Sequence, residues 1–239
     1  MQIVTNEARA RAEQRKGNGL LIAAMLAYLA GFGQAWLVPA NPYSDALSIA
    51  GLVLGTLLWL VSQSYVRRVG PRYRQDAALD KALKGLDNRY TLLHFPDAGL
   101  PDHLLVGPAG VRVLVPRGVP GRVRCRDDRW SRPSTFGWLG MFGVEQLGNP
   151  TRDAARGVTQ VTQRLGRALD GEQAAAAPVG ANVVFTHPNV QLEIESCRYP
   201  VARGRELRAQ LQRDKGSLRP PELARLRQAL EPQRSSAAR

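Results

Sequence analysis

Two long stretches without a charged residue constrain this chain more than any other feature of its sequence. Residues 19–38 (GLLIAAMLAYLAGFGQAWLV) supply the roughly 20 apolar residues that cross the hydrocarbon core of a membrane. Residues 47–66 (LSIAGLVLGTLLWLVSQSYV) do the same, and the turn-rich connector PANPYSD separates the two stretches. Because a helix satisfies its own backbone hydrogen bonds in lipid, we expect residues 19–66 to form a transmembrane helical hairpin.

Positive charges flank both ends of the expected hairpin, whereas its connector carries only Asp45. This distribution predicts a two-pass inner-membrane protein with both ends in the cytoplasm, including a basic N-terminal segment, 1–18. A signal peptide cleaved near Ala40 is the alternative for the first stretch, and it would still leave the bulk of the protein in the cytoplasm. The flanking cations are Arg9, Arg11, Arg15, Lys16, Arg67, Arg68, Arg72 and Arg74.

Small residues recur at four-residue spacing along both stretches, at Ala23, Ala27, Gly31 and Ala35 and at Gly51 and Gly55. Such stripes let helix backbones approach closely in lipid, either within the hairpin or between two chains. A homodimer through Gly51 and Gly55 is therefore one expected assembly. No charged residue lies within either stretch, which argues against a transporter, pump or channel.

The rest of the chain is strongly basic. The whole chain has 33 Lys and Arg residues against 20 Asp and Glu, a formal net charge of +13, and most of this excess follows the hairpin. Nucleic acid and anionic lipid are the partners that such a charge attracts, although Arg-rich composition also occurs without any ligand. Cys125 and Cys197 lie far apart without a CxxC pattern, which argues against a disulfide framework or a zinc ribbon and predicts reduced thiols.

Hydrophobic periodicity predicts an α/β domain with a mixed sheet over residues 76–213. Residues 126–148 are expected to be an irregular loop, and 217–239 a basic, largely disordered tail with at most a short helix at 221–230. The expected order is a helix at 76–86, strands at 90–95, 103–106, 110–115 and 121–125, a helix at 150–169, a strand at 181–186 and a helix at 204–213.

Several short motifs follow one another along this domain. After Asp76 come Pro101-Asp102-His103-Leu104-Leu105-Val106-Gly107-Pro108-Ala109-Gly110-Val111, Trp130, Asn149-Pro150 and Val183-Val184-Phe185-Thr186-His187-Pro188. In this order and spacing, the chain resembles the nuclease-related domain (NERD) family, a branch of the restriction-endonuclease-like fold. The resemblance covers residues 76–213 and implies that a restriction-endonuclease-like mixed-sheet domain follows the expected transmembrane hairpin.

The resemblance also implies where an active site would lie. The family's first metal-binding Asp falls on Asp102, with Asp76 as a second carboxylate, but its Glu falls on Val115 and its Lys on Arg117. Val115 cannot bind Mg²⁺, and Arg117 can hold a phosphate but is too basic to accept a proton. Asp153 stands where relatives often have Gln. The chain therefore looks like a degenerate nuclease, or pseudoenzyme, for which no metal or other cofactor is expected.

Two other functions stay open at this point. A carboxylate from elsewhere in the domain, Asp127, Asp128, Glu193 or Glu195, would restore an active Mg²⁺-dependent phosphodiester hydrolase that uses Asp102 as a metal ligand and Arg117 as a phosphate clamp. A structural protein that binds anionic lipid or a protein partner is the other alternative.

Arginines alternate with the aromatic residues Trp130, Phe136, Trp138 and Phe142 from the fourth expected strand onward, as they do in proteins that stack bases and hold phosphates. Packing of an aromatic loop against the domain or the membrane surface explains the same pattern. The first interpretation is therefore a membrane-anchored, catalytically inactive cytoplasmic binding or scaffolding module, with nucleic acid as one expected ligand. The expected phosphate-binding or nucleic-acid-binding residues are Arg117, Arg122, Arg124, Arg126 and Trp130.

Overall fold

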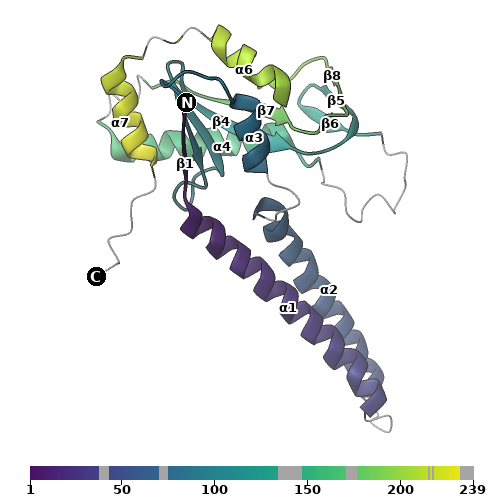
Figure 1. Cartoon of the computed structure of the whole chain (residues 1–239). Coiled ribbons are helices and arrows are strands. Elements are labelled where there is room, and N and C mark those ends of the chain that lie inside the picture. Colours follow the sequence, from purple (N-terminus) through teal and green to yellow (C-terminus); the bar gives the residue numbers. More distant parts are fainter. Residues whose placement is uncertain are drawn as a thin grey trace, which may run out of the picture. The chain divides into compact units, whose positions relative to one another are not determined.

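The computed structural model describes residues 1–37, 43–69, 75–133, 147–170, 177–214, 216 and 218–231, without the side chains of 34–37, 64 and 66–69. The chain divides into two units (Figure 1). Residues Ala8–Arg74 form a helical unit, and Met1–Glu7 together with Gln75–Arg239 form an α/β unit. In sequence, the helical unit is thus an insertion into the α/β unit.

Helices α1 (Glu7–Leu37) and α2 (Ser44–Val69) of the helical unit pack against each other in antiparallel directions. A Cβ atom on Gly51 would lie 2.7 Å from the Cα of Gly31, so these two glycines set the closest approach of the backbones. Gly55 packs against the ring of Tyr28. Gly51 and Gly55 therefore contact α1 of their own chain, which is the packing within the hairpin that the sequence allowed. The homodimer through these glycines stays a prediction.

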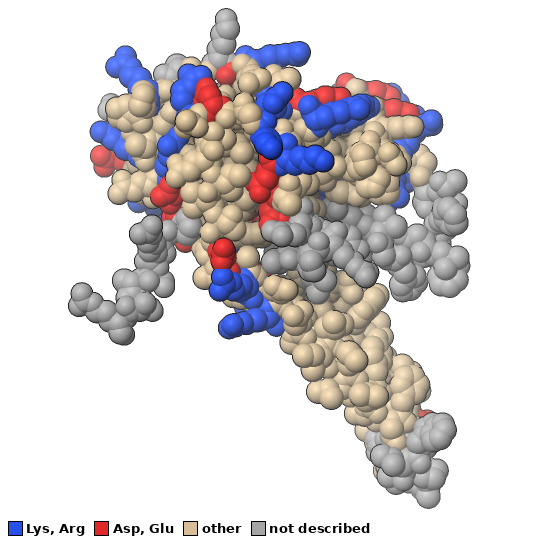
Figure 2. All heavy atoms as spheres, viewed as in Figure 1, with Lys and Arg blue, Asp and Glu red and all other residues tan. Residues whose placement is uncertain are grey.

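Polar side chains of α2 are satisfied inside this helix pair. The Ser48 hydroxyl donates to the carbonyl of Gly31 at 2.9 Å, and the Ser62 hydroxyl donates to the carbonyl of Gly17 at 2.9 Å. The hydroxyls of Tyr28 and Thr56 lie 3.0 Å apart. On the face in view, Figure 2 shows a mostly uncharged surface along this unit between its charged end and its tip.

Within the described residues, α2 is the helix that is long and apolar enough to cross a membrane. Its window Ser44–Gln63 has a mean hydropathy of 1.8, and only 6% of it is buried. The first expected span, 19–38, includes residues 34–38, whose side chains lie outside the description. Its crossing, and with it the transmembrane hairpin, stays a prediction.

The α/β unit is built on a six-stranded mixed sheet with the strand order β1-β2-β3-β4-β7-β9. Strands β2, β3 and β4 form an antiparallel meander, and only β3 runs opposite to the other strands. This confirms the predicted α/β class with a mixed sheet. The strands are β1 (Gln2–Thr5), β2 (Thr91–His94), β3 (His103–Gly107), β4 (Gly110–Arg117), β7 (Val179–Phe185) and β9 (Val201–Arg203).

Helices cover both faces of this sheet. On one face, α4 (Pro150–Ala168) and α7 (Pro220–Leu230) pack over one hydrophobic cluster, and on the other face α3 (Gln75–Leu83) and α6 (Gly204–Arg213) pack over a second. Helix α4 begins as the sequence predicts, because the Asn149 side chain caps the helix by accepting from the backbone N–H of Arg152 at 3.0 Å. Its Gly157 lies so close to Val113 that an added Cβ would come within 2.7 Å.

A second, three-stranded sheet has the order β6-β5-β8 and its own small core. Strands β5 (Gly121–Arg126) and β6 (Arg129–Ser131) form a hairpin, and β8 (Val190–Ile194) pairs parallel to β5. The hairpin turns at Asp127 and Asp128, whose φ angles of 49° and 60° fit a two-residue type I′ turn. The predicted strand 121–125 exists, but it belongs to this sheet rather than to the main one.

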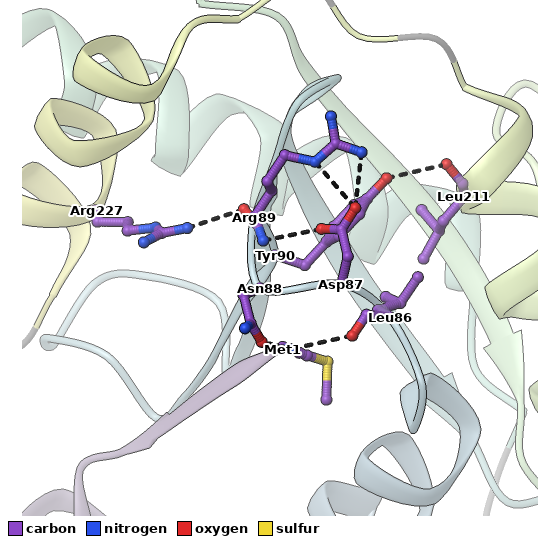
Figure 3. Close-up of polar contacts among 8 residues, drawn as sticks. All are labelled: Met1, Leu86, Asp87, Asn88, Arg89, Tyr90, Leu211 and Arg227. Carbon is purple, nitrogen blue, oxygen red and sulfur yellow. Dashed lines mark hydrogen bonds and ion pairs between the residues drawn. The ribbon is translucent and has the colours of Figure 1, made fainter.

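The segment before β2 connects several elements of the α/β unit (Figure 3). The Met1 ammonium donates to the carbonyl of Leu86 at 3.0 Å and to the Asn88 side chain at 3.1 Å. The Tyr90 hydroxyl donates to the carbonyl of Leu211 in α6, and burial raises the pKa of Tyr90. Arg227 of α7 donates to the carbonyl of Arg89. Strand β1 and two C-terminal helices are thereby attached to one short segment.

The expectations about three irregular segments have different outcomes. The expected loop 126–148 contains strand β6, because the Asp127-Asp128 turn pairs it with β5, whereas 134–146 lie outside the described residues. In the expected tail 217–239, the short helix that the sequence allowed at 221–230 is present as α7, and its Leu223, Leu226 and Leu230 are buried in the core. The N-terminal segment 1–18 is not a separate region, since it contains β1 and the first turns of α1.

The cysteines also differ from expectation. Cys125 and Cys197 form a disulfide, with their Cα atoms 6.4 Å apart. Parallel pairing of β5 with β8 places Cys125 opposite Ile194. Cys197 follows Ile194 by three residues and therefore lies close to Cys125. The sequence separation of 72 residues gave no hint of this contact, and the prediction of reduced thiols is wrong for this structure.

Candidate phosphate-binding site

The structure places the expected nuclease residues Val115 and Arg117 on the face of β4 that α4 covers. Val115 is buried in the core cluster of α4. The Arg117 guanidinium pairs with Asp153 of α4 and donates to the carbonyls of Leu147 at 3.1 Å and Pro116 at 2.9 Å. Arg117 and Asp153 both depart from the family pattern, and here they bind each other. These contacts join Arg117 to α4 and to the residue Leu147 before it, and the role of Arg117 as a phosphate clamp stays a prediction.

Asp76 does not join this pair. It lies at the start of α3, on the opposite face of the sheet from Arg117. Asp102 immediately precedes β3, and its carbonyl accepts from the backbone N–H of Phe95 at 2.7 Å. Asp153 is the carboxylate that the hydrogen bonds of Arg117 bring to this end of β4.

The expected nucleic-acid residues of the second sheet have partners of their own. Pairing of β5 with β8 places Arg124 opposite Glu193, and Glu193 binds Arg124 at 2.8 Å and Arg122 at 3.1 Å. Arg126 lies 3.3 Å from Glu195. Two of the four carboxylates considered for a displaced metal site, Glu193 and Glu195, are thus engaged with arginines. These exposed ion pairs are weak, but each reduces the local positive charge.

Trp130 is oriented toward the core rather than toward a surface for stacking. Its indole N–H donates to the Thr151 hydroxyl at 2.8 Å, and its ring centroid lies 5.8 Å from that of Phe185. Trp130 also packs against the core of the second sheet. The aromatic side chain therefore joins the two sheets and α4, whereas Trp138, Phe136 and Phe142 lie outside the described residues.

A buried chain of titratable groups lies beside the expected site, on the face covered by α3. The Nδ1 atoms of His94 and His103 are 2.8 Å apart, and Nε2 of His94 lies 3.0 Å from a carboxylate oxygen of Asp80. If Nε2 of His94 donates to Asp80, its Nδ1 accepts from the Nδ1–H of His103. Burial and the neighbouring His94 lower the pKa of His103 to about 3.

The lowered pKa of His103 predicts that the folded protein loses stability in weak acid. The pKa of an unfolded histidine is about 6.5, so between roughly pH 6.5 and 3 the unfolded state binds a proton that the folded state excludes. Stability should fall as the pH falls through this window, by up to about 1.4 kcal/mol per pH unit. Urea unfolding of the full chain in detergent, at several pH values, measures this slope. His103→Gln should flatten it, whereas His187→Gln should not; an equal slope in all three proteins would contradict the assignment.

The described residues contain an opening that the sequence did not reveal. A cavity of about 540 Å³ lies where β7 and β9 end and α6 begins. Its walls carry five cationic side chains and, among the described residues, no carboxylate. The carboxyl ends of parallel strands are the usual ligand position in open α/β sheets, and a helix N-terminus favours an anion. The lining residues are Ala78, Lys81, Ala82, Lys84, Phe185, Thr186, His187, Pro188, Arg203, Gly204, Arg205 and Arg208.

Packing of α3 against α6 gathers these cations. Leu79 and Leu83 of α3 share a buried cluster with Leu207 and Leu211 of α6, which turns Lys81 and Lys84 toward the start of α6. In addition, Arg208 donates to the carbonyl of Lys84 at 3.0 Å. We call this cavity, with Lys81, Lys84, Arg203, Arg205 and Arg208, the basic pocket.

Nearby acidic charge is small. Glu206 lies 3.7 Å from Arg203 and 3.6 Å from Arg205, at the outer limit of ion pairing, and is half exposed. It also accepts from the backbone N–H of Arg203, as a helix cap. The basic pocket therefore keeps a net positive charge that suits phosphate groups.

Comparison with known proteins adds no identification, because no protein-family model, no curated protein and no solved structure matches this chain.

Proposed function

We propose that this protein is a membrane-anchored module whose α/β unit binds the phosphates of nucleic acid without cleaving them. The observation that carries this proposal is the basic pocket, with its five cations and no carboxylate among the described lining residues. Nucleic acid offers closely spaced phosphates, and several cations in one opening can contact more than one of them. The proposal retains the module predicted from the sequence but moves its phosphate contacts from the second sheet to the basic pocket.

Pairing of β1 with β2 supports the anchor. β1 precedes the helical unit and β2 follows it, so both strands can share one sheet only on the same side of a membrane. The chain then crosses an even number of times between residues 7 and 75. Since α2 is apolar enough for one crossing, α1 is the other, and residues 19–66 are a two-pass hairpin. Cleavage of a signal peptide near Ala40 would separate β1 from its sheet.

The cations at both ends of the hairpin argue for a cytoplasmic α/β unit at the inner membrane. In this proposal, the unit is a degenerate NERD-like domain of the restriction-endonuclease-like fold. The order α3, β2, β3, β4, α4 and β7 agrees with the helix, hairpin, long helix and apolar strand of that resemblance. Catalytic loss is supported by buried Val115 and by the Arg117–Asp153 pair.

Neutralising both lysines of the basic pocket should weaken binding of nucleic acid. We expect Lys81→Gln with Lys84→Gln to lower the affinity for a labelled single-stranded oligonucleotide about tenfold and to reduce the log–log salt slope, because phosphate contacts are lost. Fluorescence anisotropy of the full chain in discs of zwitterionic lipid measures both quantities. Arg122→Gln with Arg124→Gln is the matched control, since it removes the same charge from the second sheet.

The same experiment tests the alternatives. Equal weakening by both double variants would mean that binding depends on net charge rather than on the basic pocket, and no binding at all would refute the proposed function. The oligonucleotide should remain intact with Mg²⁺ or Mn²⁺; cleavage that Asp102→Ala abolishes would instead establish the active hydrolase. Binding to vesicles with anionic headgroups that survives excess nucleic acid would favour the lipid-binding alternative.

A further inference from the structure

A group of three metal-ligating side chains lies in the second sheet, apart from the basic pocket. Cys125 lies in β5, Asp128 lies in the following turn, and Cys197 comes shortly after β8. One ligand atom from each lies within 4.8 Å of the others, and no other such group occurs among the described residues. Cys125 is fully buried, whereas Asp128 and Cys197 are partly exposed, so solvent reaches one side of the group.

Hydrogen bonds fix the Asp128 carboxylate. One of its oxygens accepts from the backbone N–H of Arg198 at 2.8 Å and from the Thr151 hydroxyl at 3.2 Å. Thr151 is itself held by the indole N–H of Trp130. Neighbouring partners of this kind orient carboxylates that bind metals. The adjacent Asp127 instead accepts from the Ser196 hydroxyl at 2.6 Å and is not part of the group.

We propose that Cys125, Cys197 and Asp128 form a Zn²⁺ site when the disulfide is reduced. A dithiol supplies two electrons and two protons, closes to its own disulfide, and leaves the Cys125 and Cys197 thiols. Zn²⁺ binding then releases the thiol protons, because thiolates are the ligands. Two thiolates and a carboxylate are a ligand set that suits tetrahedral Zn²⁺, with water in the fourth position.

The surroundings favour reversible occupation. Disulfides are uncommon in the cytoplasm, where thiols are kept reduced, so the proposed location of the α/β unit favours the form that binds metal. Oxidation forms the Cys125–Cys197 bond and removes both thiolates. The site thus holds either a metal or a disulfide, and both states connect β5 to the segment after β8.

Zinc titration of the full chain in detergent tests this proposal. The protein is reduced with dithiothreitol, desalted under argon and titrated against a chromogenic chelator. We expect about one Zn²⁺ per chain in the reduced protein and none in the oxidised protein. Asp128→Asn should lower the affinity about tenfold or more, whereas Asp127→Asn, a neighbour in the same turn, should not.

Cobalt provides a readout of the ligands. Co²⁺ bound to the reduced protein should show sulfur-to-metal charge-transfer bands, which Cys197→Ser should weaken because one thiolate is lost. Failure of the reduced protein to bind Zn²⁺ at micromolar concentration would overturn the proposal. Equal affinity of Asp128→Asn and Asp127→Asn would overturn the assignment of the carboxylate.

Discussion

Gly110→Ala should destabilise the α/β unit by about 3 kcal/mol, through backbone strain of about 1–2 kcal/mol plus a steric clash. Gly110 has a φ of 97°, and an added Cβ would collide with the carbonyl of Pro178. That carbonyl accepts from the backbone N–H of Val111 at 2.9 Å, where β4 meets β7. The clash therefore acts on the pairing of β4 with β7. A lower midpoint of urea unfolding, for the full chain in detergent, measures the loss.

Gly121→Ala is the matched control for this substitution. Gly121 also has a positive φ, 84°, but no atom lies within 4 Å of the Cβ that alanine would add. Gly121→Ala should lower the free energy of unfolding only by the cost of this backbone conformation, about 1–2 kcal/mol. Equal losses at Gly110 and Gly121 would contradict the predicted clash at Pro178.

The second large effect concerns the pair of Arg117 and Asp153. Asp153→Asn should cost about 2 kcal/mol, because it leaves a guanidinium whose side chain is only 15% exposed without its counter-charge. This figure lies below that for a fully buried pair because Asp153 is 39% exposed. Urea unfolding of the full chain again measures the change.

Replacing both partners should recover much of that loss. Arg117→Met with Asp153→Leu removes both charges together and leaves apolar side chains between β4 and α4. Replacing both members of a buried ion pair in this way often changes the free energy of unfolding little. Glu193→Gln is the control for an exposed ion pair and should cost less than about 1 kcal/mol. If Asp153→Asn cost no more than Glu193→Gln, the Arg117–Asp153 pair would not stabilise the packing of α4.

Much of the main sheet could be predicted from the sequence because its elements carry local signals. The hydrophobic spacing of α4 and its Asn149-Pro150 start are visible without a structure, and so are the apolar runs of β3, β4 and β7. β1 carries no such signal, since QIVT is short and its partner β2 lies beyond the whole helical unit. β8 and β9 were missed because they are short and only partly buried.

The candidate site was less accessible to sequence analysis, because it depends on contacts between distant segments. Arg117 and Asp153 could each be recognised as a departure from the family pattern, but not as partners across the interface of β4 and α4. Likewise, Lys81 and Lys84 lie far in sequence from Arg203, Arg205 and Arg208. Their common opening results from the packing of α3 against α6 and from where β7 and β9 end. The one local signal of the basic pocket was the grouping of Arg203, Arg205 and Arg208 where β9 ends and α6 begins.

The position of β1 gives the protein a fixed order of assembly during translation. The ribosome makes β1 before both long helices, and β2 only after them. β1 must therefore wait, unpaired, until the entire helical unit has been synthesised. In the proposed topology, insertion of only one of the two helices into the bilayer would place β1 and the rest of the sheet on opposite sides of the membrane. Such a chain lacks an edge strand and leaves the edge of β2 unpaired, which is a template for pairing with another chain.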